Sequence, residues 1–239
     1  MTARVVVLDA AGTLVEVAGS VGEAYAEEAR AAGAELDPHA VESGFARAMR
    51  DAPPLAFGRL PPRDRPAAAR GWWRETARAA IAGPDGLPGG FAFEVFFDRA
   101  WERFARAGAW RVPADVRPAL RALRARGVPL AVFSNWDARL GPLLSELGLA
   151  GYFCRVLVSS ELAAAKPDPA AFEAVARELA GVDAASGPPL MVGDRLDHDV
   201  APAVAAGWDA VWLDRRGIGG APEGTRIVRD LRELSAPSG

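Results

Sequence analysis

The chain has 239 residues, of which 50% are hydrophobic and 25% are charged, and its formal net charge is −3 at pH 7. These values are typical of a globular protein and exclude both a chain disordered throughout and a global basic surface for nucleic acid. The single cysteine, Cys154, excludes an intrachain disulfide framework and a zinc site built from several cysteines. No apolar run approaches the roughly 20 residues of a membrane span, so we expect no membrane partner.

An apolar run at residues 5–8 predicts a buried strand near the start of the chain. A secretory signal would need a charged segment, an apolar core and a cleavage site ahead of that strand. The residues before the strand are too few to provide them, and we therefore expect a cytoplasmic protein.

The region 16–110 shows helical spacing of its apolar residues and no convincing strand. Breaks rich in proline and glycine divide it into predicted helices at 21–32, 38–50, 66–81 and 93–107. We interpret 16–110 as a helical cap domain inserted after the first strand. The remaining segments, 1–15 and 111–239, then form one domain that is discontinuous in sequence.

Short β-branched and apolar runs alternate with amphipathic stretches in the C-terminal half. The predicted strands are 129–133, 155–158, 190–192 and 210–213, and the predicted helices are 114–126, 138–147, 170–180 and 200–206. Continuous apolar strands separated by helices are typical of a parallel sheet covered on both faces. With the run at 5–8, the pattern predicts a Rossmann-like three-layer α/β core with five parallel strands.

Polar side chains follow the predicted strands. Asp9 comes after the first strand, Ser134 and Asn135 come after the second, Lys166 precedes the helix that follows the third, and Asp194 comes after the fourth. In a doubly wound sheet, ligands bind at the carboxyl ends of the strands, near the point where strand order reverses. We therefore expect these side chains to converge at one edge of the sheet.

These residue types have complementary chemistry. A carboxylate at a strand end can act as a nucleophile, and Mg²⁺ with oxygen ligands relieves repulsion between neighbouring carboxylates. Lys166, the single lysine of the chain, would favour an ionised carboxylate beside it and can hold phosphate oxygens. The hydroxyl of Thr13 or Ser134, with backbone N–H groups of the Gly12 turn, can bind further phosphate oxygens.

Four ordered motifs resemble those of the haloacid dehalogenase-like hydrolase superfamily. They are Leu8-Asp9-Ala10-Ala11-Gly12-Thr13-Leu14, Ser134-Asn135, Lys166-Pro167-Asp168, and Gly193-Asp194 followed by Asp199. The helical insertion after the first motif is similar to a type C1 cap. The segment Ser134-Asn135-Trp136-Asp137-Ala138-Arg139-Leu140, the Trp72-Trp73 pair and Ala205-Ala206-Gly207-Trp208 resemble the "rhythmically expressed" branch of that superfamily.

The resemblance implies a role for each matching residue. Asp9 would be the nucleophile. Mg²⁺ would be held by Asp9, the backbone carbonyl of Ala11, Asp194 and, directly or through water, Asp199. The residues that would bind phosphate or position Asp9 are Thr13, Ser134, Asn135 and Lys166. The second acid of the fourth motif is Asp199 by the family's spacing, and Asp197 is the alternative.

One residue departs from the family's phosphatase pattern. Phosphatases of this superfamily usually carry a second Asp two residues after the nucleophile, which protonates the leaving group and then activates water. Ala11 stands at that position and can do neither, and the loss of a general acid–base typically costs about 10²–10⁴ in rate. Phosphonoacetaldehyde hydrolase also has Ala there, but it needs a cap lysine that region 16–110 lacks.

The sequence therefore predicts a Mg²⁺-dependent phosphohydrolase that acts on a small phosphorylated metabolite through an aspartyl-phosphate at Asp9. One alternative is a protein that binds or senses a phosphorylated ligand with negligible turnover. Another is a metal-independent 2-haloacid dehalogenase, against which Asp194 and Asp199 argue. We expect no nucleic-acid partner, and the Trp-rich cap permits a homodimer.

Overall fold

The computed structural model describes residues 4–83, 86–182 and 187–235. Its contacts divide the chain into two compact units. The core unit comprises Met1–Glu16, Leu55–Pro62 and Val112–Gly239, and the helical unit comprises Val17–Pro54 and Arg63–Arg111. Among the described residues, no helix is both long and apolar enough to cross a membrane.

The core unit is built on a parallel sheet whose strands run in the order β5-β4-β1-β6-β7-β8. These strands are β1 (Val6–Leu8), β4 (Leu130–Ser134), β5 (Arg155–Val158), β6 (Leu190–Gly193), β7 (Asp209–Leu213) and β8 (Arg226–Val228). The predicted α/β class is confirmed, and all five predicted strands are present. The sheet has a sixth strand, β8, which the apolar pattern did not predict.

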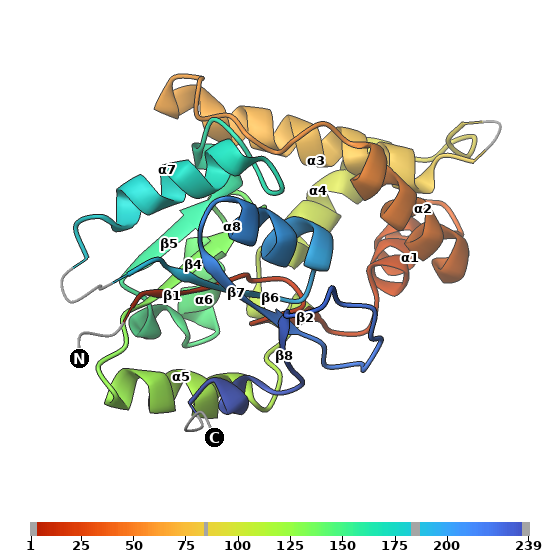
Figure 1. The fold of residues 1–239 in the computed structure, drawn as a ribbon. Helices are drawn as coiled ribbons and strands as arrows, with labels where there is room; N and C mark the ends of the chain where they lie inside the picture. The colour runs from red at the N-terminus through yellow and green to blue at the C-terminus, as the bar shows by residue number, and fades with distance from the viewer. Residues whose placement is uncertain (1–3, 84–85, 183–186, 236–239) are drawn as a thin grey trace. The chain divides into compact units, whose positions relative to one another are not determined.

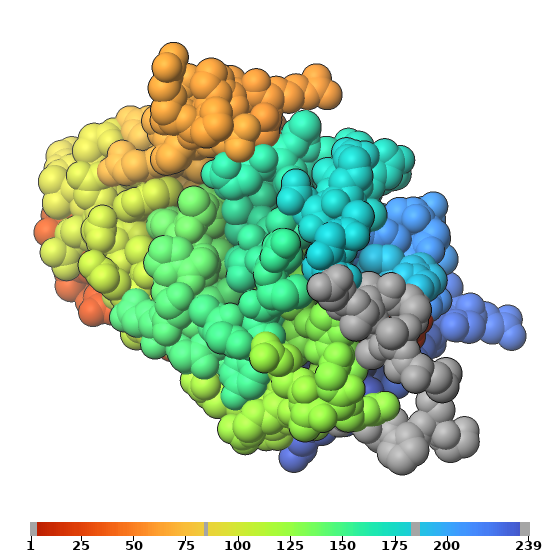
Figure 2. Space-filling model, turned by 90° about the vertical axis from the view of Figure 1, so that its left-hand side faces the viewer, coloured from red at the N-terminus to blue at the C-terminus, as the bar shows by residue number. Residues whose placement is uncertain are grey.

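Helices cover both faces of this sheet, as Figure 1 shows. They are α5 (Val116–Ala125), α6 (Leu140–Glu146), α7 (Pro169–Leu179) and α8 (Ala201–Ala205). Val7 pairs with Ala131 and with Met191 across the sheet, and these side chains pack with Phe172 of α7 and Ala203 of α8 in one buried cluster. In Figure 2 the side of the core unit near β5 shows the surfaces of α5, α6 and α7 in yellow-green, green and blue-green.

The position of β1 determines where a ligand can bind. β1 lies between β4 and β6, and the chain runs outward from β1 to β5 on one side and to β8 on the other. Strand order therefore reverses beside β1, and its carboxyl end is the expected place for chemistry in this architecture.

The helical unit contains α1 (Val21–Ala31), α2 (Pro38–Asp51), α3 (Arg65–Ile81) and α4 (Phe93–Phe104). Ser20 and Glu23 form a capping box at the start of α1, and Asp37 caps α2. Tyr25, Phe96 and Ala77 belong to its apolar core. The prediction that 16–110 contains no strand is wrong at its two ends, because the short strands β2 (Glu16–Val17) and β3 (Trp110–Arg111) pair with each other there.

One segment inside the predicted insertion groups with the core unit. The backbone N–H of Phe57 donates to the Ser160 carbonyl at 3.2 Å, and that of Gly58 donates to the Leu162 carbonyl at 2.7 Å. A Cβ on Gly58 would lie 2.4 Å from the Leu162 carbonyl carbon, so the two backbones are in direct contact. The single cap domain at 16–110 stays a prediction, and Leu55–Pro62 is counted here with the core unit.

The chain also contains short helical segments. They are η1 (Pro62–Asp64), η2 (Ala107–Ala109), η3 (Ala150–Tyr152), η4 (Ser159–Glu161), the π-helical η5 (Leu196–Val200) and η6 (Leu231–Ser235).

Candidate active site

Asp9 directly follows β1, and Lys166 lies against it. The Lys166 Nζ is 2.7 Å from Asp9 Oδ1, 2.5 Å from Asp199 Oδ1 and 3.1 Å from the Phe133 carbonyl oxygen. Asp9, Lys166 and Asp199 are all buried, at 7%, 4% and 1% exposure. A buried lysine that bridges two carboxylates neutralises one of their two negative charges and fixes the positions of both.

Asp199 lies in η5, and both of its carboxylate oxygens have hydrogen-bond partners. Its Oδ1 pairs with Lys166, and its Oδ2 accepts the backbone N–H of Arg195 at 3.1 Å. A Cβ on Gly193 would lie 2.2 Å from Asp199 Oδ2, so only glycine fits at the end of β6. The Asp199 carboxylate therefore lies against the end of β6, next to Asp194.

Asp194 follows β6 and faces the turn after β1. Thr13 Oγ1 donates to Asp194 Oδ1 at 3.3 Å, and the Trp212 indole donates to the Asp194 carbonyl at 2.9 Å. Gly12 has a φ of +80°, and a Cβ there would lie 2.3 Å from Asp194 Oδ2. Glycine at this position meets both the backbone conformation and the contact with the carboxylate.

The three acids form a cluster with the properties of a cation site. Asp9, Asp194 and Asp199 offer carboxylate oxygens within 4.8 Å of one another. Burial, and then the charges of Asp9 and Asp199, raise the pKa of Asp194 to about 7. Burial also raises the pKa of Asp9, against the opposing effects of Lys166 and the Ser134 hydroxyl. A divalent cation with oxygen ligands would favour the ionised form of these buried carboxylates and relieve the repulsion between them.

Lys166 stays charged in this cluster. Burial by itself lowers the pKa of the Lys166 ammonium, but the charges of Asp199 and Asp9 outweigh that effect and raise it above the usual value. Lys166 is therefore a fixed positive charge beside Asp9.

Ser134 is the last residue of β4 and Asn135 follows it, but the two side chains face different partners. Ser134 is 2% exposed, and its hydroxyl hydrogen-bonds Asp9. The Asn135 Nδ2 donates to the Lys166 carbonyl at 2.7 Å, and the Lys166 N–H donates to Asn135 Oδ1 at 2.9 Å. Of the two roles expected for Asn135, phosphate binding and positioning, this pairing favours positioning, exerted through Lys166.

The turn after β1 differs from the expectation for its N–H groups. The Gly12 N–H donates to the Val15 carbonyl at 2.8 Å, and the Thr13 N–H donates to the Ala10 carbonyl at 3.3 Å. The expectation that the Gly12 turn offers N–H groups to phosphate is wrong for these two, because the turn's own hydrogen bonds use them. The Ala11 side chain is exposed, and the residue bridges to Val15.

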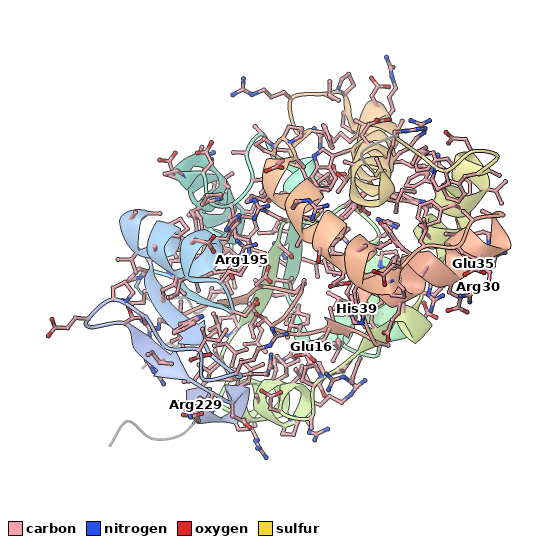
Figure 3. The ribbon with its side chains drawn as sticks, turned by 90° about the vertical axis from the view of Figure 1, so that its right-hand side faces the viewer. Glu16, Arg30, Glu35, His39, Arg195 and Arg229 are labelled. Atoms are coloured by element: carbon pink, nitrogen blue, oxygen red, sulfur yellow. The ribbon has the colours of Figure 1, made fainter. Side chains whose placement is uncertain are left out.

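Asp197 lies outside the cluster. Its side chain is 65% exposed and pairs with Arg195 at 2.7 Å. Arg195 is labelled in Figure 3 next to α8. The hydrogen bond from Arg195 lowers the pKa of the Asp197 carboxyl. The geometry therefore brings Asp199, and not Asp197, to Asp9 and Asp194.

Sequence reasoning missed one charged pair that contacts the site. The Arg215 guanidinium donates to the Gly12 and Thr13 carbonyls and pairs with Asp115. Arg215 is one of many arginines in an almost lysine-free chain, and Asp115 precedes a helix, where an acid usually serves as a cap. Neither residue therefore carries a signal that a sequence pattern could separate from the background.

Comparison with known proteins identifies the family of the chain. The family model described as haloacid dehalogenase-like hydrolase matches residues 3–207. The chain belongs to the haloacid dehalogenase-like hydrolase family. The predicted superfamily is thereby confirmed, and the chain is a hydrolase by family. Its place in the "rhythmically expressed" branch stays a prediction.

The chain is similar to several individual proteins. Haloacid dehalogenase-like hydrolase domain-containing protein 3 of Danio rerio is 32% identical over 215 residues, which are 89% of this chain and 86% of that protein. A phosphoserine phosphatase of Thermus thermophilus is 38% identical over 115 residues, 46% of this chain and 45% of that enzyme. The crystal structure of a phosphatase from Thermococcus onnurineus is 24% identical, with a TM-score of 0.65 and coverage of 97% and 95%. Solved structures with this fold include L-2-haloacid dehalogenases as well as phosphatases, so the fold alone does not distinguish the two reactions.

Proposed function

We propose that the protein is a Mg²⁺-dependent phosphohydrolase that acts on a small phosphorylated metabolite through a phosphoryl group carried on Asp9. The observation that carries this proposal is the cluster of Asp9, Asp194 and Asp199, within 4.8 Å of one another, beside the buried Lys166. The phosphatases among the relatives support a phosphate ester as the substrate class.

The oxygen donors at this position fit Mg²⁺, a hard cation that prefers carboxylate and carbonyl ligands. Asp9, Asp194 and the Ala11 carbonyl would hold it, with Asp199 acting directly or through water. When bound, Mg²⁺ would neutralise negative charge on the phosphoryl group during transfer.

The chain's own residues account for the covalent step. A carboxylate oxygen of Asp9 attacks phosphorus and forms a new P–O bond, while the bond to the leaving oxygen breaks and that oxygen keeps the electron pair. Lys166 and the Ser134 hydroxyl hold Asp9 in place and favour its ionised form. Water then attacks phosphorus, which releases inorganic phosphate and restores the Asp9 carboxylate.

Ala11 limits which substrates react well. No acid at this position can protonate the leaving oxygen, so a substrate whose leaving group departs as a stable anion loses least. Phosphoanhydrides and acyl phosphates meet this condition, as does the model ester p-nitrophenyl phosphate.

The test is hydrolysis of p-nitrophenyl phosphate with Mg²⁺ and with EDTA, using Asp9→Asn as the matched variant. We expect turnover that requires Mg²⁺ and that falls by at least about 10³-fold in Asp9→Asn, because the nucleophile is lost. Turnover that persists in EDTA or in Asp9→Asn would contradict the proposal.

Two further measurements separate the alternatives. Release of halide from a 2-haloacid without metal would favour a dehalogenase. Stabilisation by a phosphorylated ligand without turnover of any phosphate ester would favour a binding or regulatory protein. The three clustered carboxylates support the phosphohydrolase over the metal-independent dehalogenase.

A further inference from the structure

Arg215 binds the turn that follows the nucleophile. Its Nη1 donates to the Gly12 carbonyl at 2.6 Å, and its Nη2 donates to the Thr13 carbonyl at 2.9 Å. One planar guanidinium that bonds two successive carbonyls fixes the orientation of both peptide groups. Arg215 comes from the segment after β7, so this contact joins two distant parts of the core unit.

Asp115 holds Arg215 from the other side. The Arg215 Nη2 lies 3.1 Å and 3.0 Å from the two Asp115 carboxylate oxygens, and Nε lies 3.2 Å from Oδ2. The backbone N–H of Leu231 donates to Asp115 Oδ2 at 2.9 Å. The side chains of Arg215 and Asp115 are only 18% and 8% exposed, which makes this a partly buried pair rather than a surface one.

Asp115 pairs with Arg215 instead of capping its own helix. It stands at the N-cap position of α5, where an aspartate normally accepts N–H groups of its own helix, but it makes no such side-chain cap. Its carboxylate is directed instead to Arg215 and Leu231. The Asp115 carboxylate therefore forms an ion pair with the arginine that holds the Gly12 turn.

The clamped turn lies against the acid cluster. Gly12 is so close to Asp194 that a Cβ would lie 2.3 Å from its carboxylate, and the Thr13 hydroxyl donates to the same carboxylate at 3.3 Å. A shift of the Gly12–Thr13 peptides would therefore move Asp194, and with it the place where a cation could bind.

We propose that Arg215, oriented by Asp115, is a positioning residue that sets the Gly12–Thr13 turn against Asp194 and so tunes cation affinity and turnover. This inference rests on the proposed function. Arg215 bonds the backbone and Asp115 rather than the reacting carboxylates, so it acts through the turn and not as a catalytic residue. Partners that orient metal ligands in this way typically contribute about 10–100-fold to metal affinity or activity.

The experiment compares Arg215→Gln and Arg215→Lys with Arg117→Gln. Arg117 is a matched control because its guanidinium also donates to two successive backbone carbonyls, those of Leu147 and Gly148, which are not part of the site. The probes are Mg²⁺ alone, titrated by calorimetry, and p-nitrophenyl phosphate hydrolysis at saturating Mg²⁺. Thermal unfolding of each variant establishes that it is folded at the assay temperature.

We expect Arg215→Gln to raise the Kd for Mg²⁺ about tenfold and to lower kcat about 10–100-fold, with KM changed less than about threefold. Arg215→Lys should be intermediate, because an ammonium keeps the charge but cannot bond Asp115 and both carbonyls at once. Arg117→Gln should match the wild type in both readouts.

Folded Arg215 variants that bind Mg²⁺ and turn over like the wild type would overturn the inference alone. If Arg215→Gln does not fold, the Mg²⁺ affinity and kcat of Arg215→Lys and Asp115→Asn test the inference instead. Both variants keep a polar side chain at each position of the pair. A wild-type protein that neither binds Mg²⁺ nor hydrolyses the ester would overturn the proposed function and this inference together.

Discussion

At the scale of single residues, the site is a balance of buried charges. Asp9, Asp194 and Asp199 bring three carboxylates together, and Lys166 supplies one positive charge among them. Burial, together with the charges of the neighbouring carboxylates, raises the pKa values of Asp9 and Asp194. A cluster of buried carboxylates of this kind lowers the stability of the metal-free protein and raises its affinity for a cation.

The raised pKa of Asp194 predicts how the stability of the metal-free protein changes with pH. The pKa of Asp194 is raised to about 7 from 3.8, so between those values the metal-free folded state holds a proton that the unfolded chain has lost. The free energy of unfolding must then fall as pH rises through this range and level off above about pH 7. Asp194→Asn removes the titrating group, so it should raise the metal-free Tm at pH 8 by several degrees and change it little at pH 4.

Calorimetric unfolding in EDTA at the two pH values measures this effect, and Asp197→Asn is the exposed control. The same Asp194→Asn variant should lose the stabilisation that Mg²⁺ gives the wild type, because a ligand carboxylate is gone. An Asn variant that is no more stable at pH 8, or that Mg²⁺ still stabilises, would contradict this description of the cluster.

Ala11 gives a second prediction at this scale. Its side chain is exposed, so an aspartate there needs no rearrangement of the core. Ala11→Asp should raise kcat/KM on an alkyl phosphate by about 10²-fold and on p-nitrophenyl phosphate by less than about tenfold, because only the poorer leaving group needs a proton. Ala11→Asn, of the same size and without the acid, should raise neither, and an aspartate that leaves both rates unchanged would show that position 11 does not limit the reaction.

At the scale of elements, close helix packing in the helical unit depends on glycine. A Cβ on Gly44 of α2 would lie 2.0 Å from the Ala80 carbonyl of α3, whereas a Cβ on Gly71 of α3 would meet nothing within 4 Å. Gly44→Ala should therefore lower the free energy of unfolding by about 1–3 kcal/mol. Gly71→Ala should raise it by about 0.5–1 kcal/mol through helix propensity. Urea unfolding of both variants checks the opposite signs, and equal effects would contradict the packing described.

Element prediction from the sequence succeeded where the periodic signal was long. Helices α1 to α4 and the buried strands of the core unit carry continuous apolar patterns, and their observed bounds lie within a few residues of the predicted ones. β8 was missed because Arg226 and Ile227 are exposed and only Val228 is buried, which is an edge strand with almost no apolar signal. β2 and β3 have two residues each, too few for any period.

At the scale of the whole molecule, the candidate site could be predicted because of strand topology. Asp9, Ser134 and Asp194 all stand at the carboxyl ends of strands that are neighbours in the sheet, so the rule for parallel sheets brings them together. The Arg215–Asp115 pair joins residues 100 positions apart through side-chain contacts, and no local pattern encodes it. The grouping of Leu55–Pro62 with the core unit likewise depends on backbone hydrogen bonds that sequence spacing does not reveal.

Ala11 also makes the central claim directly measurable. Without an acid–base group to activate water, the second half of the reaction should be slower than transfer of the phosphoryl group from a good leaving group, so the phosphorylated enzyme should accumulate. The measurement is rapid mixing with p-nitrophenyl phosphate and Mg²⁺, followed by acid quenching and mass analysis of the peptide that contains Asp9. We predict a burst of p-nitrophenol stoichiometric with the enzyme and one phosphoryl group on Asp9, both absent in Asp9→Asn. Turnover without a burst and without phosphoryl on that peptide would contradict the account.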